Sequence, residues 1–264
     1  MYAFSYERPT SVADAVSALK ASEDAKLLAG GQTFIPTLKQ RLAQPDALID
    51  LNTIAELRFI REEGDNVVIG AMSRHGEIAG SEIVQRRIPG LVVLAGQIGD
   101  PAVRNRGTIG GSIANNDPSA CYPAALLAYG ATVHTDRRQI PAEDFFIDMF
   151  ETALEPDEIV TAVSIPVPDA SYYSKFANPA SRYAIVGVMV AKTKDGVRVG
   201  VTGAKTCAYR ATELEQALSG NFAPSALDGI TVDAADMNAD IHASAAYRAH
   251  LVKVMAKRSV ERLV

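Results

Sequence analysis

The chain has 264 residues, 48% of them hydrophobic and 22% charged, with a net charge of -5 and two cysteines. This length is enough to bury a core and predicts about two domains. The acidic balance argues against a nucleic-acid partner, which needs a basic surface. Two cysteines cannot supply the four thiolates of an iron–sulfur cluster and are too few for a disulfide framework. Any redox centre is therefore organic or is carried by a partner.

The N-terminus argues against a targeting segment. Glu7 and Arg8 occupy positions where a signal peptide needs an apolar core, and no apolar run is long enough to span a membrane. We therefore expect a cytoplasmic protein.

The first fifty residues have the pattern of a small βαβ-type unit. Helical spacing of apolar residues predicts a helix over 11–22, with Thr10 or Ser11 as its N-cap. Short apolar runs predict strands at 26–29 and 46–51. Between these strands, "AGGQT" leads into apolar residues at helical spacing, so a glycine pair lies at a strand-to-helix junction.

The next hundred residues differ in composition and in predicted secondary structure. Two strands joined by "EEGDN" begin near residue 57, and short helical pieces follow up to residue 99. Residues 100–135 are rich in glycine and small polar residues, and they end in a predicted helix at 123–128 and a strand at 131–135. This composition permits close approach of a ligand to the backbone.

A boundary is expected after the predicted strand at 159–165, where prolines stand at positions 166 and 168. A hairpin with "KDG" as its turn follows, and then helices at 211–219 and 244–263. Strands followed by helices predict an α+β second domain.

The two glycine clusters suggest a common ligand. A single glycine pair is more often an ordinary tight turn, but Gly30-Gly31-Gln32-Thr33 and Thr108-Ile109-Gly110-Gly111-Ser112 together could converge on one diphosphate. Backbone N–H groups and the hydroxyls of Thr33, Thr108 and Ser112 would be the donors. Neither cluster matches GxGxxG or GxxxxGK, so the common nucleotide-binding folds lose support.

Four motifs in this order resemble one family, the FAD-binding medium subunit of the molybdenum hydroxylases, which include xanthine dehydrogenase and aerobic carbon monoxide dehydrogenase. The motifs are "LLAGGQTFIPTLK", "VRNRGTIGGSIANNDPSACYPAALLA", "DEIVTAVSIP" and "SRYAIVGVMVA", and together they span most of the chain. The resemblance implies an α+β protein. A two-part FAD-binding domain of the vanillyl-alcohol-oxidase (PCMH) type would cover residues 1–167, in subregions 1–54 and 55–167. A smaller C-terminal domain would cover residues 168–264.

The resemblance also implies a set of FAD-binding residues. One side of the diphosphate would be wrapped by Leu28, Ala29, Gly30, Gly31, Gln32, Thr33, Phe34 and Ile35, and the other by Thr108, Ile109, Gly110, Gly111 and Ser112. Ile159 or Val160 would lie near the flavin, and Tyr183 would approach the isoalloxazine ring or, alternatively, be an ordinary strand aromatic.

Two positions depart from the family pattern. Cys121 stands where many relatives have an aspartate near the adenosine half of FAD, and Asp117 is a possible replacement. Ala177 stands where a basic residue is expected, and Lys175 is the nearest alternative. A thiol is a poor substitute for a carboxylate that accepts a ribose hydroxyl.

The function implied by the resemblance is electron transfer within a heterotrimer. A large subunit would carry the molybdenum cofactor and a small subunit two [2Fe–2S] clusters, and this chain would pass electrons through non-covalent FAD to an external acceptor. FAD suits this place because it exchanges electrons both in pairs and singly, as a junction between iron–sulfur clusters and a two-electron acceptor requires. The resemblance further suggests a dimer of heterotrimers.

The sequence offers no catalytic or metal-binding group of its own. The four histidines are scattered, and no metal-ligand spacing appears. Two alternatives stay open: a free-standing flavin oxidase of the same superfamily, which needs its own base and substrate pocket, and a scaffold that has lost FAD.

Overall fold

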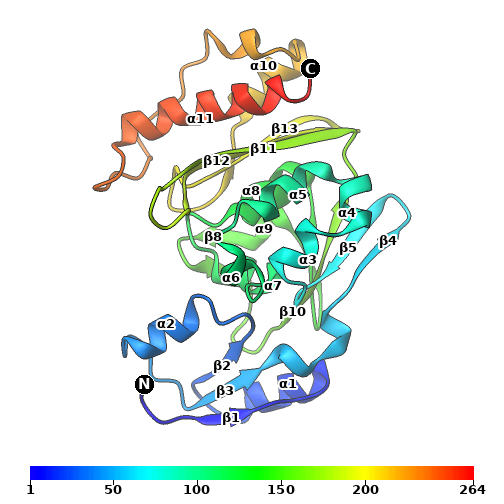
Figure 1. The fold of residues 1–264 in the computed structure, drawn as a ribbon, viewed down its shortest axis with the longest axis vertical. Helices are drawn as coiled ribbons and strands as arrows, with labels where there is room; N and C mark the ends of the chain where they lie inside the picture. Colours follow the sequence, from blue (N-terminus) through cyan, green and yellow to red (C-terminus); the bar gives the residue numbers. More distant parts are fainter.

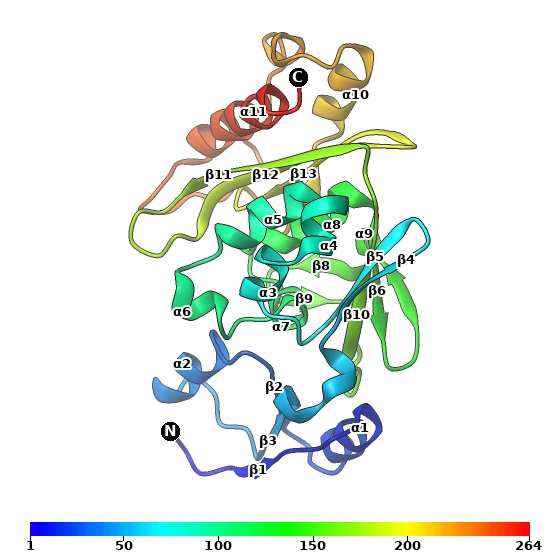
Figure 2. The same ribbon diagram turned by 45° about the vertical axis from the view of Figure 1, so that its right-hand side comes forward.

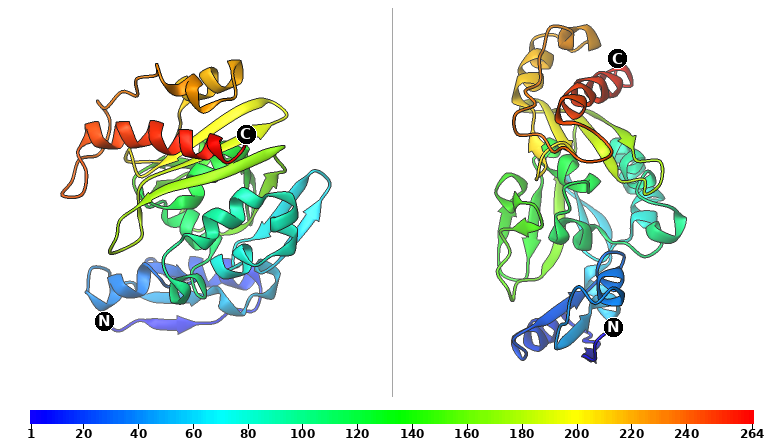
Figure 3. Two further views of the ribbon diagram at one scale, coloured as in Figure 1. Left: turned by 45° about the horizontal axis from the view of Figure 1, so that its top comes forward. Right: turned by 90° about the vertical axis from the view of Figure 1, so that its left-hand side faces the viewer.

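The computed structural model describes residues 1–264, and three parts follow one another along the long axis of the molecule (Figures 1 and 3). The N-terminal part lies at one end, a central part follows, and the last two long helices lie at the opposite end. No helix is long and apolar enough to cross a membrane.

The N-terminal part is a three-stranded parallel sheet in the order β1-β3-β2. Ser11 begins the first helix by accepting a hydrogen bond from the Asp14 amide, as a cap residue does. The predicted strand, glycine turn and helix are present. The elements are β1 (Ser5–Glu7), α1 (Val12–Lys20), β2 (Ala25–Leu28), α2 (Phe34–Lys39) and β3 (Ala47–Asp50), followed by the 3-10 turns η1 (Leu51–Thr53) and η2 (Ala55–Leu57).

The central part is a five-stranded antiparallel sheet, ordered β4-β5-β10-β6-β7, with short helices packed beside it (Figure 2). Its strands are β4 (Ile60–Glu63), β5 (Asn66–Gly70), β6 (Thr132–Thr135), β7 (Gln139–Pro141) and β10 (Val160–Pro166), and β8 (Phe146–Asp148) and β9 (Glu151–Thr152) form a separate hairpin. Its helices are α3 (His75–Ala79), α4 (Glu82–Arg87), α5 (Pro89–Gly96), α6 (Pro101–Arg104), α7 (Ile109–Asn115), α8 (Cys121–Tyr129) and α9 (Ala142–Phe145).

The second glycine cluster is helical, which the sequence pattern did not predict. Thr108 is the N-cap of α7, and its hydroxyl accepts the Gly111 amide at 3.1 Å. Glycine disfavours helix interiors, but the cap bond and the buried side chains of Ile109 and Ile113 hold this short helix in place. The helix ends at Asn116, which has the left-handed conformation.

The C-terminal part is an antiparallel sheet covered on both faces (Figure 1). Successive residues of β12 alternate between them: Met189 packs with the core around α5 and α8, while Val188 and Val190 pack with α10 and α11. The elements are β11 (Ala170–Ala177), β12 (Ala184–Thr193), β13 (Gly196–Thr202), β14 (Tyr209–Arg210), α10 (Thr212–Gly220), η3 (Pro224–Leu227) and α11 (Ala245–Glu261).

Candidate functional site

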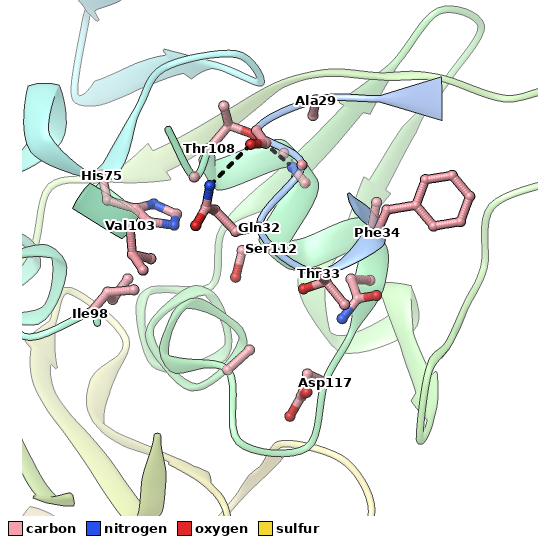
Figure 4. Close-up of a pocket in the computed structure, with 18 of the residues that line it drawn as sticks. Ala29, Gln32, Thr33, Phe34, His75, Ile98, Val103, Thr108, Ser112 and Asp117 are labelled. Atoms are coloured by element: carbon pink, nitrogen blue, oxygen red, sulfur yellow. Dashed lines mark hydrogen bonds between the residues drawn. The ribbon is translucent and has the colours of Figure 1, made fainter. Parts of the chain in front are cut away.

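A cavity of about 570 Å³ lies where the three parts meet (Figure 4). The N-terminal part contributes the end of β2 and the glycine turn before α2. The central part contributes α7 and the loops beside it, and the C-terminal part contributes Lys175 and residues 181–183. A volume of this size is typical of a site for a small molecule or cofactor.

The first glycine loop presents unpaired backbone donors. The amides of Gly30, Gly31, Gln32 and Thr33 donate to no acceptor within the chain, and all four residues line the cavity. Gly31 has φ +71°, a left-handed conformation that glycine adopts without strain. Successive free N–H groups in such a turn form an anion-binding concavity.

The second glycine cluster differs because its amides are already paired. The Gly110 amide donates to the Ala71 carbonyl at 2.9 Å, and the Gly111 and Ser112 amides donate to Thr108. The Ser112 hydroxyl has no partner within the chain and lines the cavity. Hydroxyl groups, rather than free amides, are therefore what this side offers to a ligand.

The two loops touch each other directly. A Cβ atom on Gly30 would overlap the carbonyl oxygen of Arg106 and lie 2.7 Å from the Gly107 Cα, and one on Gly111 would lie 3.3 Å from the Ala29 Cβ. The predicted convergence of the loops is thus present in the structure. Gly30 is required because the loops approach closely, in addition to any room that it leaves for a ligand.

Nearly all the residues predicted for the site line the cavity. They are Leu28, Ala29, Gly30, Gly31, Gln32, Thr33, Phe34, Thr108, Gly110, Gly111, Ser112, Asp117, Ile159, Val160 and Tyr183. Ile35 and Ile109 lie outside the lining. Ile35 folds back so that its Cδ1 would contact a Cβ on Gly31, and Ile109 is fully buried in the central core.

The cavity carries an excess of positive charge. Lys175 and Arg182 line it without an ion-pair partner, Lys26 also lines it but is paired with Asp24 at 2.7 Å, and Asp117 is its one acidic side chain. One Asp117 oxygen accepts the Ser119 amide at 2.8 Å, which leaves the other without a backbone partner. This charge balance favours an anionic ligand.

The structure clarifies the two departures from the family pattern. Cys121 is buried in the cavity wall, and the Lys175 ammonium lies 3.7 Å from its sulfur. Lys175 also donates to the carbonyls of Gln97 at 2.6 Å and Arg182 at 2.9 Å. Ala177 is exposed and does not line the cavity. Lys175 therefore brings to the cavity the positive charge that Ala177 lacks.

His75 is a buried part of the cavity wall. The sequence did not predict this, because the four histidines are scattered along the chain and form no motif. Its Nδ1 lies 3.2 Å from the Tyr122 hydroxyl, and its Nε2 lies against Gly107. Burial, with a smaller effect of Arg104, lowers the pKa of His75 to about 4. The imidazole is therefore neutral at physiological pH.

The start of β10 is held by a charged network. Glu158 is buried and accepts two hydrogen bonds from Arg138, at 2.8 and 2.7 Å. These bonds lower the pKa of Glu158 to about 2 despite its burial. The Ile159 amide donates to Asp136 at 2.8 Å. The network fixes Ile159 and Val160 against the cavity.

Tyr183 closes the cavity from the C-terminal part. Its side chain is 48% exposed, and partial burial together with the nearby Asp117 carboxylate raises its pKa. The phenol is therefore protonated at neutral pH.

Apolar wall residues such as Met72, Ile98 and Val103 also line the cavity, and their sequence pattern does not distinguish them from ordinary core residues. No cluster of histidine, cysteine and acidic side chains has a metal-binding arrangement.

Comparisons with known proteins agree with this architecture. Residues 2–168 match the family described as the FAD binding domain in molybdopterin dehydrogenase, and residues 171–263 match the CO dehydrogenase flavoprotein C-terminal domain. The chain is 36% identical to the nicotine 6-hydroxylase medium subunit of Paenarthrobacter nicotinovorans and 38% identical to the carbon monoxide dehydrogenase medium chain of Afipia carboxidovorans, in each case over 98% of this chain and 96% of the relative. It superimposes on a chain of reconstituted CO dehydrogenase from Oligotropha carboxidovorans with a TM-score of 0.93 and 37% identity, covering 99% of this chain and 97% of that one.

Proposed function

The chain belongs to the family of FAD-binding domains of molybdopterin dehydrogenases, and from this premise we propose that it is the FAD-carrying electron-transfer subunit of a molybdenum hydroxylase. It takes electrons from [2Fe–2S] clusters on a partner subunit and passes them to an external acceptor. The observation that carries the proposal is the row of four unpaired amides, from Gly30 to Thr33, on the wall of a positively charged cavity.

The donor set of the cavity fits a dinucleotide with a diphosphate. The free amides of the first loop and the hydroxyls of Thr108 and Ser112 would hold the phosphate oxygens, and Lys175 and Arg182 supply charge of the opposite sign. Asp117 is the one acidic side chain in the cavity that could accept a ribose hydroxyl, because the Cys121 thiol is a weaker acceptor than a carboxylate. We propose that the residues predicted from the sequence to bind FAD do so in this chain.

Bound FAD would supply the ability to take up single electrons, one after another, and to hold two of them for the external acceptor. The chain itself binds, orients and shields the cofactor. The neutral imidazole of His75 adds no charge to the wall, and the protonated phenol of Tyr183 remains a hydrogen-bond donor. The side chains of Ile159 and Val160 exclude water on the side of β10. None of these groups is arranged as a base and nucleophile for an organic substrate.

The partners follow from the relatives. Those named above are medium subunits or medium chains of larger enzymes. We extend this to the present chain as one member of a heterotrimer with a molybdenum-cofactor large subunit and a [2Fe–2S] small subunit. Pairing of two heterotrimers and a cytoplasmic location complete the proposal.

The cofactor assignment is tested by purifying the full chain with its partners, recording the visible spectrum and then denaturing the protein. We expect a flavin spectrum, release of FAD into the supernatant and an unmodified polypeptide mass. A chain that neither contains nor takes up FAD would contradict the proposal. FAD retained covalently on a histidine would favour the free-standing oxidase instead.

A further inference from the structure

The hairpin of β8 and β9 exposes an unusual group of apolar side chains. Ile147 is 53% exposed, Met149 is 44% exposed and Phe150 is 58% exposed, and all three lie within four consecutive residues at its tip. Phe150 has φ +56°, a left-handed conformation that is costly for a bulky residue. An exposed apolar group held in an unfavourable backbone conformation needs a reason outside the fold.

A buried asparagine clamps this hairpin to the cavity wall. The Asn116 side-chain amide donates to the carbonyls of Asp148 and Glu151, each at 2.8 Å, and the Asn116 backbone carbonyl accepts the Phe150 amide at 3.1 Å. Asn116 is 1% exposed and follows Asn115, which lines the cavity. The hairpin is therefore anchored at the end of α7, one residue from the cavity, and β9 runs beside that helix (Figure 2).

The unpaired charges in and beside the hairpin are acidic. Asp144, Asp148 and Glu151 are exposed and form no ion pair, whereas the neighbouring Glu143 is paired with Arg198 and Arg210. A complementary surface would have an apolar pocket with lysine or arginine around it.

We propose that this hairpin, residues 146–152, is the docking element for the iron–sulfur partner subunit, with Phe150 as its central apolar anchor. The inference rests on the proposed function, which requires an electron-donating partner close to the FAD cavity. A partner seated on the hairpin lies against α7, whose opposite end carries Thr108 and the glycine cluster. Contacts made there are rigidly connected to the cavity wall through Asn116.

The test compares Phe150→Gly with the wild-type chain in binding to the separately purified iron–sulfur subunit. Glycine removes the anchor and also relieves the left-handed conformation, so the variant should keep its FAD content and melt at the same temperature or higher. We expect its dissociation constant to rise about tenfold or more, as for a central interface anchor. Met149→Ser should weaken binding in the same direction.

Ile241→Ser is the matched control, because Ile241 is 95% exposed but lies far along the chain in the C-terminal part. Its binding should equal that of the wild type. Wild-type affinity in both Phe150→Gly and Met149→Ser overturns the proposal, as does an effect of these variants on self-association alone. In both cases the proposed function survives, provided that the wild-type chain holds FAD and binds the partner. A wild-type chain without FAD contradicts the proposed function directly.

Discussion

The two glycine loops, similar in sequence, play different roles at the scale of single residues. The amides of Gly30 and Gly31 are free, while those of Gly110 and Gly111 are used within the chain. A Cβ on Gly110 would lie 2.6 Å from the Ala71 Cβ, so this glycine serves helix packing. Only the first loop therefore has the free backbone amides expected of a phosphate cradle, and the second offers hydroxyl groups.

Gly30→Ala should separate the two loops. Its Cβ would overlap the Arg106 carbonyl, which belongs to the backbone and cannot rotate away. We expect the free energy of unfolding to fall by about 1–3 kcal/mol and the bound FAD to decrease, measured by thermal unfolding and by flavin absorbance. Gly96→Ala is the control, because a Cβ there meets nothing within 4 Å, and its stability should stay equal or increase. Normal FAD content in Gly30→Ala would contradict the loop contact.

Lys175→Met tests the charge of the cavity with an unbranched side chain that is only one heavy atom shorter. The substitution removes a cation from the wall and the bonds to the Gln97 and Arg182 carbonyls. We expect the dissociation constant of FAD to rise about tenfold, corresponding to about 1.4 kcal/mol. Lys253→Met is matched to it, since Lys253 also donates to two carbonyls but lies outside the cavity. Equal FAD affinity in the two variants would exclude a role for the Lys175 charge.

His75 should make the stability depend on pH in a defined window. Its folded pKa of about 4 lies below the ordinary value of 6.5, so below pH 6.5 the unfolded chain binds a proton that the folded chain does not. Stability therefore falls as the pH drops from 6.5 to 4, by roughly 3 kcal/mol in total. Urea unfolding at several pH values gives the free energy of unfolding as a function of pH. Between pH 6.5 and 4 this free energy should change less steeply with pH in His75→Gln than in the wild type. An unchanged slope would mean that His75 is not responsible.

At the scale of elements, the periodicity of apolar residues predicts the helices and strands that bury one regular face. Apolar spacing was enough for the α1 and α11 helices and for the β10 strand, because each buries a regular face. The α7 helix was not predicted, since it depends on the Thr108 cap and on surrounding core residues rather than on helix propensity. The β11 strand was also missed, because adjacent Tyr172 and Tyr173 and the polar Lys175 obscure its alternation.

Glu158→Gln tests the network at the start of β10. It leaves the Arg138 guanidinium without its carboxylate partner and should lower the free energy of unfolding by about 1–3 kcal/mol. This contribution of Glu158 disappears as the pH falls from 4.5 to 2, because its folded pKa is the lower one. Glu155→Gln, at a more exposed carboxylate, should change stability by less than about 0.5 kcal/mol. Chemical denaturation of both variants at neutral pH decides, and equal stabilities would contradict the role assigned to Glu158.

At the scale of the whole molecule, the site is made by three parts that are distant in sequence. Motifs identified the two glycine loops and Tyr183, because these residue types in this order are specific. They could not show that Ile98, Val103 and His75 complete the wall, since those positions come together only when the parts pack. The sequence named Lys175 as the nearest alternative to a basic residue at position 177, and the structure places Lys175 on the cavity wall.

The most direct test of the account is anaerobic mixing of the FAD-loaded chain with the chemically reduced iron–sulfur subunit, followed by visible absorbance. We expect the flavin absorbance to be lost while the iron–sulfur absorbance returns, and an added external acceptor to restore the oxidised flavin spectrum. FAD that stays oxidised in a complex shown to have formed would contradict the central claim that this chain carries electrons away from its partner.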